Sequence, residues 1–310
     1  MSLIDAHTHI FKAVKGRVAA SATSSLRFGK VNFNNKAIRL LPPLAIDTTF
    51  SAEILLEYMD YAGIDRAVLL QTPFYGEMNH YIYKTVKKWP QKFVGAAYID
   101  LWRSNAKKVL DYVVNVLDFK IIKIEFSINT GFSGIYPGIT INDTNLEWFW
   151  TECEKRNIIV ILDLDTVDSL AYQTDGIKNI ILGHPDLKIV ISHLAHPPVN
   201  YELDRQKVKS WEEQAALAKY PNVWLDMAVL PSISFEEYPY PKTVQFIKKS
   251  IKLVGTDKIM WGSDMPSLLI HITYNQYISF VKKCCDFLTE SDLNKILGEN
   301  ASKLFFENII

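Results

Sequence analysis

The sequence contains few cysteines and no long apolar run. Its three cysteines, Cys153, Cys284 and Cys285, are an odd number with two of them adjacent, which argues against a disulfide framework and indicates reduced thiols in the cytoplasm. No stretch approaches the roughly 18 apolar residues that a membrane-spanning helix needs. The first residues lack the cationic and apolar segments of a signal peptide. The sequence therefore predicts a soluble cytoplasmic protein without a membrane partner.

The chain also lacks an excess of either charge. Lysine and arginine together number 34, as do aspartate and glutamate. Nonspecific binding to nucleic acid depends on a basic surface that neutralises phosphates, so this balance argues against a nucleic-acid partner. With 48% hydrophobic residues over 310 positions, the chain has enough apolar side chains for a large core. Its length suits one large domain or two ordinary ones.

Short apolar runs alternate with longer helical patterns along the whole chain. The runs cover residues 3–10, 64–71, 93–100, 119–126, 158–164, 187–194, 222–228 and 258–264. Most are continuously apolar, which is typical of parallel strands covered on both faces. Eight strand–helix units predict an α/β fold, a (β/α)8 TIM barrel that forms one domain over residues 1–310. An open doubly wound sheet is the alternative, because alternation alone does not show whether a sheet closes.

Two segments exceed the repeating unit. Residues 11–50 follow the first strand, contain a Pro-Pro pair and show little periodicity. We expect them to form a long loop over the carboxyl ends of the strands, where barrel enzymes keep their active sites. Near the end, LTESDLNKILGENASKLFF predicts a terminal helix pair with Thr289 as N-cap. Ser51 and Gly63 are the expected N-cap and C-terminal stop of the first barrel helix.

Polar residues interrupt the apolar strands near their carboxyl ends. In the motif DAHTHI, Asp5, His7 and His9 share one face of an extended strand, so two imidazoles converge. They are either ligands of a divalent metal, most often zinc, or simply two polar residues near a terminus. The later strand ends carry Glu125, Asp163, His193, Asp226 and Asp264. In a closed barrel these ends surround one opening and predict a mixed nitrogen and oxygen metal site, although Glu125 and Asp226 could instead cap helices.

Four motifs, DAHTHI, VISHLAHPP, WGSDMP and ILGENASKLF, together resemble an amidohydrolase-related family of the metal-dependent TIM-barrel hydrolase superfamily. Members of this family include aminocarboxymuconate semialdehyde decarboxylase. The resemblance extends over nearly the whole chain. It implies that His7, His9 and Asp264 bind a divalent metal and that Asp264 acts as a base towards water. It also implies that His193 polarises the substrate or handles a proton.

One position departs from the pattern of that family. Its metal-binding members usually end the fifth strand with histidine, whereas IVILDLD places Asp163 there. A carboxylate at this position can bind zinc, and it shifts the preference towards manganese. Alternatively the site is metal-free, as a resemblance to sugar and dicarboxylate lactonases implies. These carry DHLGKPP where this chain has SHLAHPP, and they can hydrolyse lactones without a required metal.

The leading hypothesis is an enzyme that hydrolyses a small molecule with the help of a metal. A nonoxidative decarboxylase, a metal-independent lactonase and a noncatalytic binding protein on the same fold are the alternatives. The residue types do not separate these activities. They also leave the oligomeric state open, a homo-oligomer included.

The segment after the first strand gives the only indication of the substrate's charge. Between residues 11 and 46 it has no aspartate or glutamate but seven basic residues. Either these keep a loop soluble, or they bind a substrate carboxylate, with Arg27 as the best candidate because Leu26 and Phe28 could anchor the loop around it. The other candidate substrate-binding residues, which end or follow strands, are Glu125, His196 and His271.

Overall fold

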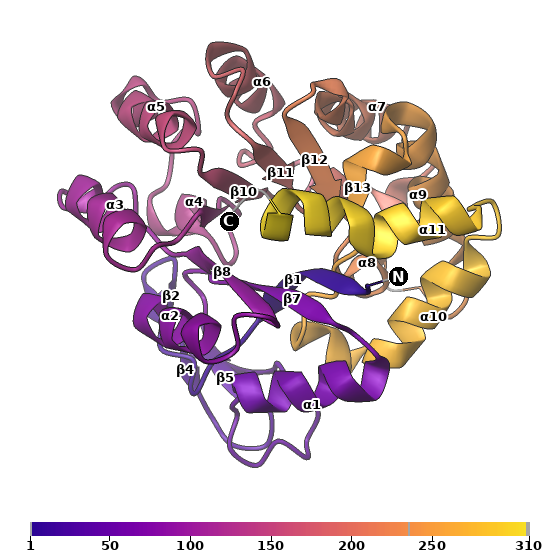
Figure 1. Cartoon of the computed structure of the whole chain (residues 1–310), viewed down its shortest axis with the longest axis horizontal. Helices are drawn as coiled ribbons and strands as arrows, with labels where there is room; N and C mark the ends of the chain where they lie inside the picture. Colours follow the sequence, from indigo (N-terminus) through magenta and orange to yellow (C-terminus); the bar gives the residue numbers. More distant parts are fainter. Residues whose placement is uncertain (1, 235, 308–310) are drawn as a thin grey trace.

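Eight parallel strands form a barrel at the centre of the computed structural model, which describes residues 2–234 and 236–307 (Figure 1). The strands are β1 (Ile4–His9), β7 (Arg66–Leu70), β8 (Phe93–Ala97), β9 (Ile121–Glu125), β10 (Ile159–Asp163), β11 (Ile189–Ile191), β12 (Val223–Asp226) and β13 (Ile259–Met260), and each pairs with the next. The last closes on the first, where the Ala6 amide donates to the Trp261 carbonyl at 3.0 Å. The structure confirms the predicted TIM barrel and excludes the open sheet.

Helices cover the outside of the barrel (Figure 1). The longer ones are α1 (Ala52–Ala62), α2 (Asn79–Lys88), α3 (Ala106–Asn115), α5 (Glu147–Lys155), α6 (Thr174–Gly183), α7 (Arg205–Ala215), α9 (Pro241–Val254) and α10 (Tyr274–Cys284), and the shorter ones are α4 (Phe132–Ile135), α8 (Leu230–Ser234) and α11 (Glu290–Asn294). The predicted ends of α1 are confirmed. The Ser51 hydroxyl accepts a hydrogen bond from the Ile54 amide, and Gly63 ends the helix in the left-handed conformation. None of the described helices is long and apolar enough to cross a membrane.

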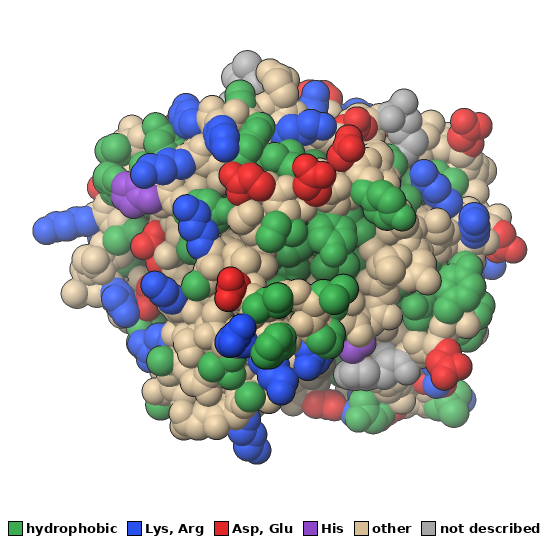
Figure 2. Space-filling view, turned by 90° about the horizontal axis from the view of Figure 1, so that it is seen from below, with side chains coloured by type: hydrophobic (Ala, Val, Ile, Leu, Met, Phe, Trp, Pro, Cys, Tyr) green, Lys and Arg blue, Asp and Glu red, His purple; other side chains and the backbone are tan. Residues whose placement is uncertain are grey.

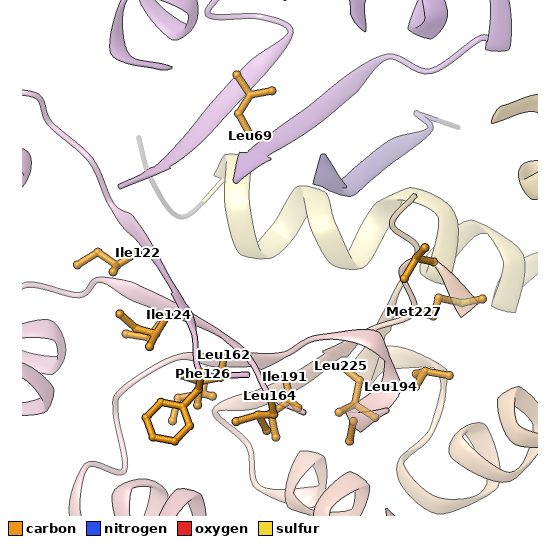
Figure 3. Packing of buried hydrophobic residues seen from close by; sticks show 14 of the residues in the cluster. Leu69, Ile122, Ile124, Phe126, Leu162, Leu164, Ile191, Leu194, Leu225 and Met227 are labelled. Atoms are coloured by element: carbon orange, nitrogen blue, oxygen red, sulfur yellow. The ribbon is translucent and has the colours of Figure 1, made fainter. Parts of the chain in front are cut away.

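The strands bury side chains on both faces, which explains why their sequences are continuously apolar. One set fills the barrel interior: Ile4, Ala6, Val68, Leu70, Ala96, Ile121, Ile159, Ile161, Val190 and Met260. Alternate residues point into a larger apolar layer under the helices, where Figure 3 shows Leu69, Ile122, Leu162, Ile191 and Leu225. Lys123, Glu125 and Asp163 continue the inward set at the carboxyl ends of β9 and β10, because they lie two or four positions after inward isoleucines.

A β-bulge in β1 changes the direction in which its two histidines point. Between its pairings at Asp5 and Thr8, β1 has one residue more than its partner strand β7. Before the bulge, Asp5 points outwards and accepts a hydrogen bond from the Tyr274 hydroxyl of α10 at 2.6 Å. After the bulge, His7 and His9 point into the barrel opening towards the other strand ends. The prediction that Asp5 shares their face is therefore wrong, because the extra residue shifts the alternation.

Residues 11–50 form five short strands rather than the expected irregular loop. These are β2 (Arg17–Val18), β3 (Ser21–Ala22), β4 (Ser24–Ser25), β5 (Lys30–Phe33) and β6 (Lys36–Arg39), which make two small antiparallel sheets. Strands of two to four residues are too short to show alternation in the sequence. This insertion lies over the carboxyl ends of the barrel strands, as predicted, where Phe33, Ile38 and Leu40 line a cavity.

Two glycines let the insertion dock backbone against backbone on the loop after β7. The amides of Lys15 and Arg17 donate to carbonyl oxygens of that loop at 3.1 and 2.9 Å. A β-carbon on Gly16 would lie 2.0 Å from the Pro73 oxygen, and one on Gly76, which has a φ of +96°, would lie 2.4 Å from the Lys15 oxygen. Any other residue would separate the two segments.

The C-terminal segment closes the amino end of the barrel (Figure 1). Its N-cap is Thr289, as predicted, but the expected helix pair is one helical run over residues 290–307 that includes two π-helical stretches. Gly298, which resembles a helix stop, instead allows close approach of the Ser2 carbonyl. Phe305 of this run packs against the barrel interior.

The surface carries side chains of all classes. On the face shown in Figure 2, basic residues lie among acidic and apolar ones. This mixture agrees with the balanced composition of the chain.

The docking of the insertion predicts that Gly16→Ala lowers stability. The added β-carbon overlaps the Pro73 oxygen, so the free energy of unfolding should fall by about 1–3 kcal/mol, as for other overpacking substitutions. Gly183→Ala at the end of α6 is the matched control, because its β-carbon meets no atom within 4 Å. Urea denaturation of both variants measures the difference. Equal stability of the two would show that the insertion is not tightly docked.

Candidate active site

The carboxyl ends of the strands surround a cavity of about 350 Å³. The cavity is lined by six of the residues that the sequence predicts for the site: His9, Glu125, Asp163, His193, His196 and Asp264. Apolar residues of the insertion and of the loop after β7 cover one side: Phe33, Ile38, Leu40, Phe74 and Tyr75. The cavity lies at the small end of the roughly 300–1,000 Å³ that is usual for ligand pockets, so it suits a small molecule.

His7 and His9 each present one ring nitrogen to Asp264. Nε2 of His7 lies 3.6 Å, and Nε2 of His9 3.1 Å, from Asp264 Oδ1. On the other side of the rings, His7 Nδ1 donates to Asp226 Oδ2 at 3.2 Å, and His9 Nδ1 donates to the Leu70 carbonyl at 3.0 Å. A carbonyl oxygen only accepts hydrogen bonds, so a neutral His9 carries its proton on Nδ1 and a lone pair on Nε2.

Burial keeps both of these rings neutral. It lowers the pKa of His7, and it lowers that of His9 to about 4, while the positive charge of Lys123 acts in the same direction. Burial opposes ionisation of Asp264, but positive charge around it, which includes the His193 cation, holds the pKa of that carboxyl below its usual range. At neutral pH a lone pair and a carboxylate oxygen therefore face each other at 3.1 Å. A cation between them would remove this repulsion.

These three residues fit a divalent metal. Two imidazole nitrogens and a carboxylate oxygen, all within 4.8 Å of one another, are common ligands of zinc and manganese. Hydrogen bonds from the distal ring nitrogens to Asp226 and to a backbone carbonyl fix the orientation of both rings, which is typical of metal-binding histidines.

A lysine that the sequence analysis missed lies at the centre of the site. Lys123 is 1% exposed, and its Nζ lies 2.8 Å from Asp163 Oδ2, 3.2 Å from Glu125 Oε2 and 3.3 Å from His7 Nε2. Burial opposes its charge, but the charges of Asp163 and Glu125 raise the pKa of the ammonium above its usual value. The sequence did contain an indication of this position. In KIIKIEF, Lys123 lies two residues before Glu125 and therefore on the same face of the strand.

Asp163 binds two histidines besides Lys123. Its oxygens lie 3.1 Å from His193 Nε2 and 3.3 Å from His196 Nε2. Burial alone would lower the pKa of His193, but the charge of Asp163 raises it to about 10, so this ring is a cation at neutral pH. Its Nδ1 donates to the Ala228 carbonyl at 3.1 Å. With both nitrogens paired, His193 is a fixed positive charge in the cavity wall.

An unusual turn brings His193 and His196 together. All four residues from His193 to His196 have φ between 50° and 58°, a left-handed conformation that costs non-glycine residues roughly 1–2 kcal/mol each. Trp211 and Tyr172 donate to carbonyl oxygens of the turn at 2.7 and 2.8 Å, and Asp226 accepts the His193 amide at 3.0 Å. Strain that is held in this way is typical of functional sites.

Glu125 and Asp226 contact the central groups of the site. The hydroxyls of Ser127 and Thr130 donate to Glu125 Oε1 at 2.7 and 2.9 Å. Burial and the neighbouring charge of Asp163 raise the pKa of Glu125, so it holds a proton at higher pH than an exposed glutamate does. Asp226 accepts from both His7 and the His193 amide, and so links the two histidine groups.

Two predicted substrate-binding residues lie elsewhere. Arg27 is exposed and its guanidinium lies over the ring of Phe28, 5.1 Å from the centroid, rather than turning into the cavity. Its backbone forms an isolated antiparallel bridge with Asp47. His271 is also exposed and does not line the cavity. The insertion therefore contributes apolar residues to the cavity, not the expected arginine.

The sequence also matches a known family. The model of the amidohydrolase family covers residues 4–306. The chain belongs to this family. This confirms the resemblance found in the motifs, and it also confirms the expectation that the protein is an enzyme. A curated relative, the L-fucono-1,5-lactonase of Burkholderia ambifaria, is 28% identical over 130 residues, which is 39% of this chain and 42% of the lactonase. The match thus spans less than half of that relative.

Solved structures share the whole fold at low sequence identity. A protein of Acinetobacter baumannii described as a 2-pyrone-4,6-dicarboxylic acid hydrolase, with citric acid bound, has a TM-score of 0.73 at 16% identity and covers 98% of this chain and 99% of its own. An amidohydrolase of Burkholderia multivorans with bound zinc has a TM-score of 0.71 at 13% identity with the same coverage. The 2,6-dihydroxybenzoate decarboxylase of Rhizobium has a TM-score of 0.65 at 16% identity and covers 98% of both chains.

The central position of Lys123 predicts that Lys123→Met is strongly destabilising. It leaves the ionised Asp163 buried without this cation, and removing one partner from a buried ion pair costs about 3–5 kcal/mol. Lys120→Met is the control, because Lys120 is half-buried and pairs with the exposed Asp118. Chemical denaturation measures both free energies of unfolding. A loss under about 1 kcal/mol for Lys123→Met would contradict a central role for the ammonium.

Proposed function

We propose that the protein hydrolyses a small lactone and uses a divalent metal held by His7, His9 and Asp264. The observation that supports this most directly is the approach of His9 Nε2 to Asp264 Oδ1, two electron-rich atoms 3.1 Å apart in a buried site. The membership in the amidohydrolase family and the zinc in the related Burkholderia multivorans structure point in the same direction. Zinc is the first candidate and manganese the second.

Asp264 is the base in this proposal. A metal bound there would polarise a carbonyl oxygen and lower the pKa of water. The Asp264 carboxylate lines the cavity and stays ionised at neutral pH, so it can accept a proton from water that attacks the ester carbonyl. The Ser267 hydroxyl donates to Asp264 Oδ2 and leaves Oδ1 directed at the histidines.

Two fixed cations stabilise the negative charge that develops on the carbonyl oxygen. The imidazolium of His193 and the ammonium of Lys123 both line the cavity, and carboxylates or carbonyl oxygens hold both in place. Positive groups that are positioned before the reaction stabilise an oxyanion without reorganising. This gives His193 the substrate-polarising role that the family resemblance implies.

The rim of the cavity suits a hydroxylated ring. Polar side chains that can bind hydroxyl groups line it: Ser127, Asn129, Thr130, Asp165 and Thr166. The apolar residues of the insertion cover the opposite side. The partial match to an L-fucono-1,5-lactonase supports a sugar lactone as the substrate class. A carboxylate on the substrate, as expected from the basic insertion, stays a prediction that the substrate panel below tests.

Asp264→Asn should abolish most lactone hydrolysis while the protein stays folded. Loss of a general base typically reduces turnover roughly 10²–10⁴-fold. Asp257→Asn is the matched control, because Asp257 lies before β13, at the amino end, and is exposed. Both variants and the wild type are assayed with a panel of three substrates: L-fucono-1,5-lactone, 2-pyrone-4,6-dicarboxylate and 2,6-dihydroxybenzoate. The release of acid measures hydrolysis, and the release of carbon dioxide measures decarboxylation. Carbon dioxide release without lactone hydrolysis would replace the proposal with a decarboxylase.

Metal content should fall sharply in the His7→Ala, His9→Ala double variant, because both imidazole ligands are lost. His80→Ala is the control, since His80 is exposed on α2. Elemental analysis after dialysis against zinc or manganese measures the stoichiometry. Unchanged metal in the double variant would place the metal elsewhere. If the wild-type protein hydrolyses lactones without metal, it is a metal-independent lactonase. If it has neither metal nor turnover, it is a binding protein.

A further inference from the structure

A second cavity, of about 460 Å³, lies on the other side of the loop that follows β7. Thr72, Phe74 and Tyr75 of this loop line the catalytic cavity, whereas Pro73 and Gly76 line the second one. We call it the outer cavity; the insertion, the loops after β7 and β8, and helices α2 and α3 surround it. Nothing in the proposed hydrolysis uses it.

Basic side chains outnumber acidic ones in the outer cavity. Lys15, Arg17, His80 and Arg103 line it, with Asp100 and Glu77 as the only carboxylates among its described residues. Both carboxylates are already engaged within the protein. Asp100 accepts from the Tyr136 hydroxyl at 2.8 Å and pairs with Arg103 at 3.2 Å, and Glu77 accepts from the Asn79 amide at 2.6 Å.

Lys15 and Arg17 are left without a negative partner. In the part of the chain that the structure describes, no ion pair joins either of them to a carboxylate. The half-buried Arg17 makes one long hydrogen bond, to the Ala19 carbonyl at 3.4 Å, and lies over the Tyr136 ring at 5.8 Å. Its other N–H groups remain available to a ligand.

The backbone of these two residues is held in a fixed position. Their amides bond to the loop after β7, and Gly16 between them packs directly against the Pro73 carbonyl. The basic segment is therefore part of the framework and not a freely moving loop. An adjoining cavity of about 340 Å³, which shares Lys15, Glu77 and His80, adds Lys12 and Lys84 to this region.

We propose that the outer cavity binds a small phosphorylated molecule. A phosphate accepts several hydrogen bonds at once, and arginine and lysine bind it with charge-assisted bonds. Lys15 and Arg17 bind the phosphate group, and the aromatic rings of Tyr98 and Tyr112 form the wall against which the rest of the molecule lies. This site accounts for basic residues of the insertion that the catalytic cavity does not use.

Calorimetric titration of the full chain with inorganic phosphate and with glucose 6-phosphate tests the site. Replacing both cations in Lys15→Gln, Arg17→Gln should weaken binding at least about tenfold, because charge-assisted bonds are lost. The control is Lys30→Gln, Lys36→Gln, which removes the same charge from the same insertion but away from either cavity. It should bind like the wild type. Circular dichroism checks that both variants are folded.

A third variant separates the outer cavity from the catalytic one. His193→Gln removes a positive charge from the catalytic cavity and should leave phosphate affinity unchanged. Three results would each overturn the proposal. The first is equal weakening of phosphate binding in the Lys15/Arg17 and Lys30/Lys36 variants, and the second is loss of binding in His193→Gln. The third is that the wild type does not bind either ligand at millimolar concentration. Equal affinity for the two ligands supports a site for the phosphate group alone, and tighter glucose 6-phosphate supports a contribution from the aromatic wall.

Discussion

The site depends on one buried positive charge, the ammonium of Lys123. It lies among Asp163, Glu125 and His7 on the inward face of β9. Its charge holds Asp163 ionised, and the ionised Asp163 in turn keeps His193 protonated. The same charge helps to keep the two histidines of β1 neutral and therefore able to bind a metal. One lysine thus contributes to opposite protonation states in His7 and His193, whose ring centroids lie 4.9 Å apart.

Two backbone irregularities position the side chains around this charge. The bulge in β1 turns His7 and His9 inwards, and the left-handed turn after β11 brings His193 and His196 to Asp163. Regular strands and right-handed turns would have placed these side chains differently. The conformational cost is offset locally, because the turn is held by several side-chain hydrogen bonds.

The barrel and much of the site could be predicted from the sequence, because repeated apolar runs determine strand positions and polar residues at their ends stand out against them. The convergence of His9, Asp163 and Asp264 follows from closure of the barrel. Lys123 was missed because a lysine within a strand is usually solvent-facing, although its place two residues before Glu125 puts both side chains on one face of β9. The position of Arg27 away from the cavity could not be predicted, because no periodic pattern in the sequence shows where a side chain of a short strand or turn points.

The barrel and the insertion contribute different residues to the cavity, and this affects how such an enzyme can evolve. The charged groups sit on strand ends whose positions the closed sheet fixes, while Phe33, Ile38 and Leu40 reach the cavity from small sheets outside it. Substitutions at these three positions reshape the cover without disturbing a barrel hydrogen bond. New substrate preferences can therefore arise in the insertion while the reactive groups are inherited unchanged. The glycine contact with the loop after β7 limits this freedom, because a residue gained or lost next to Gly16 would shift the whole cover.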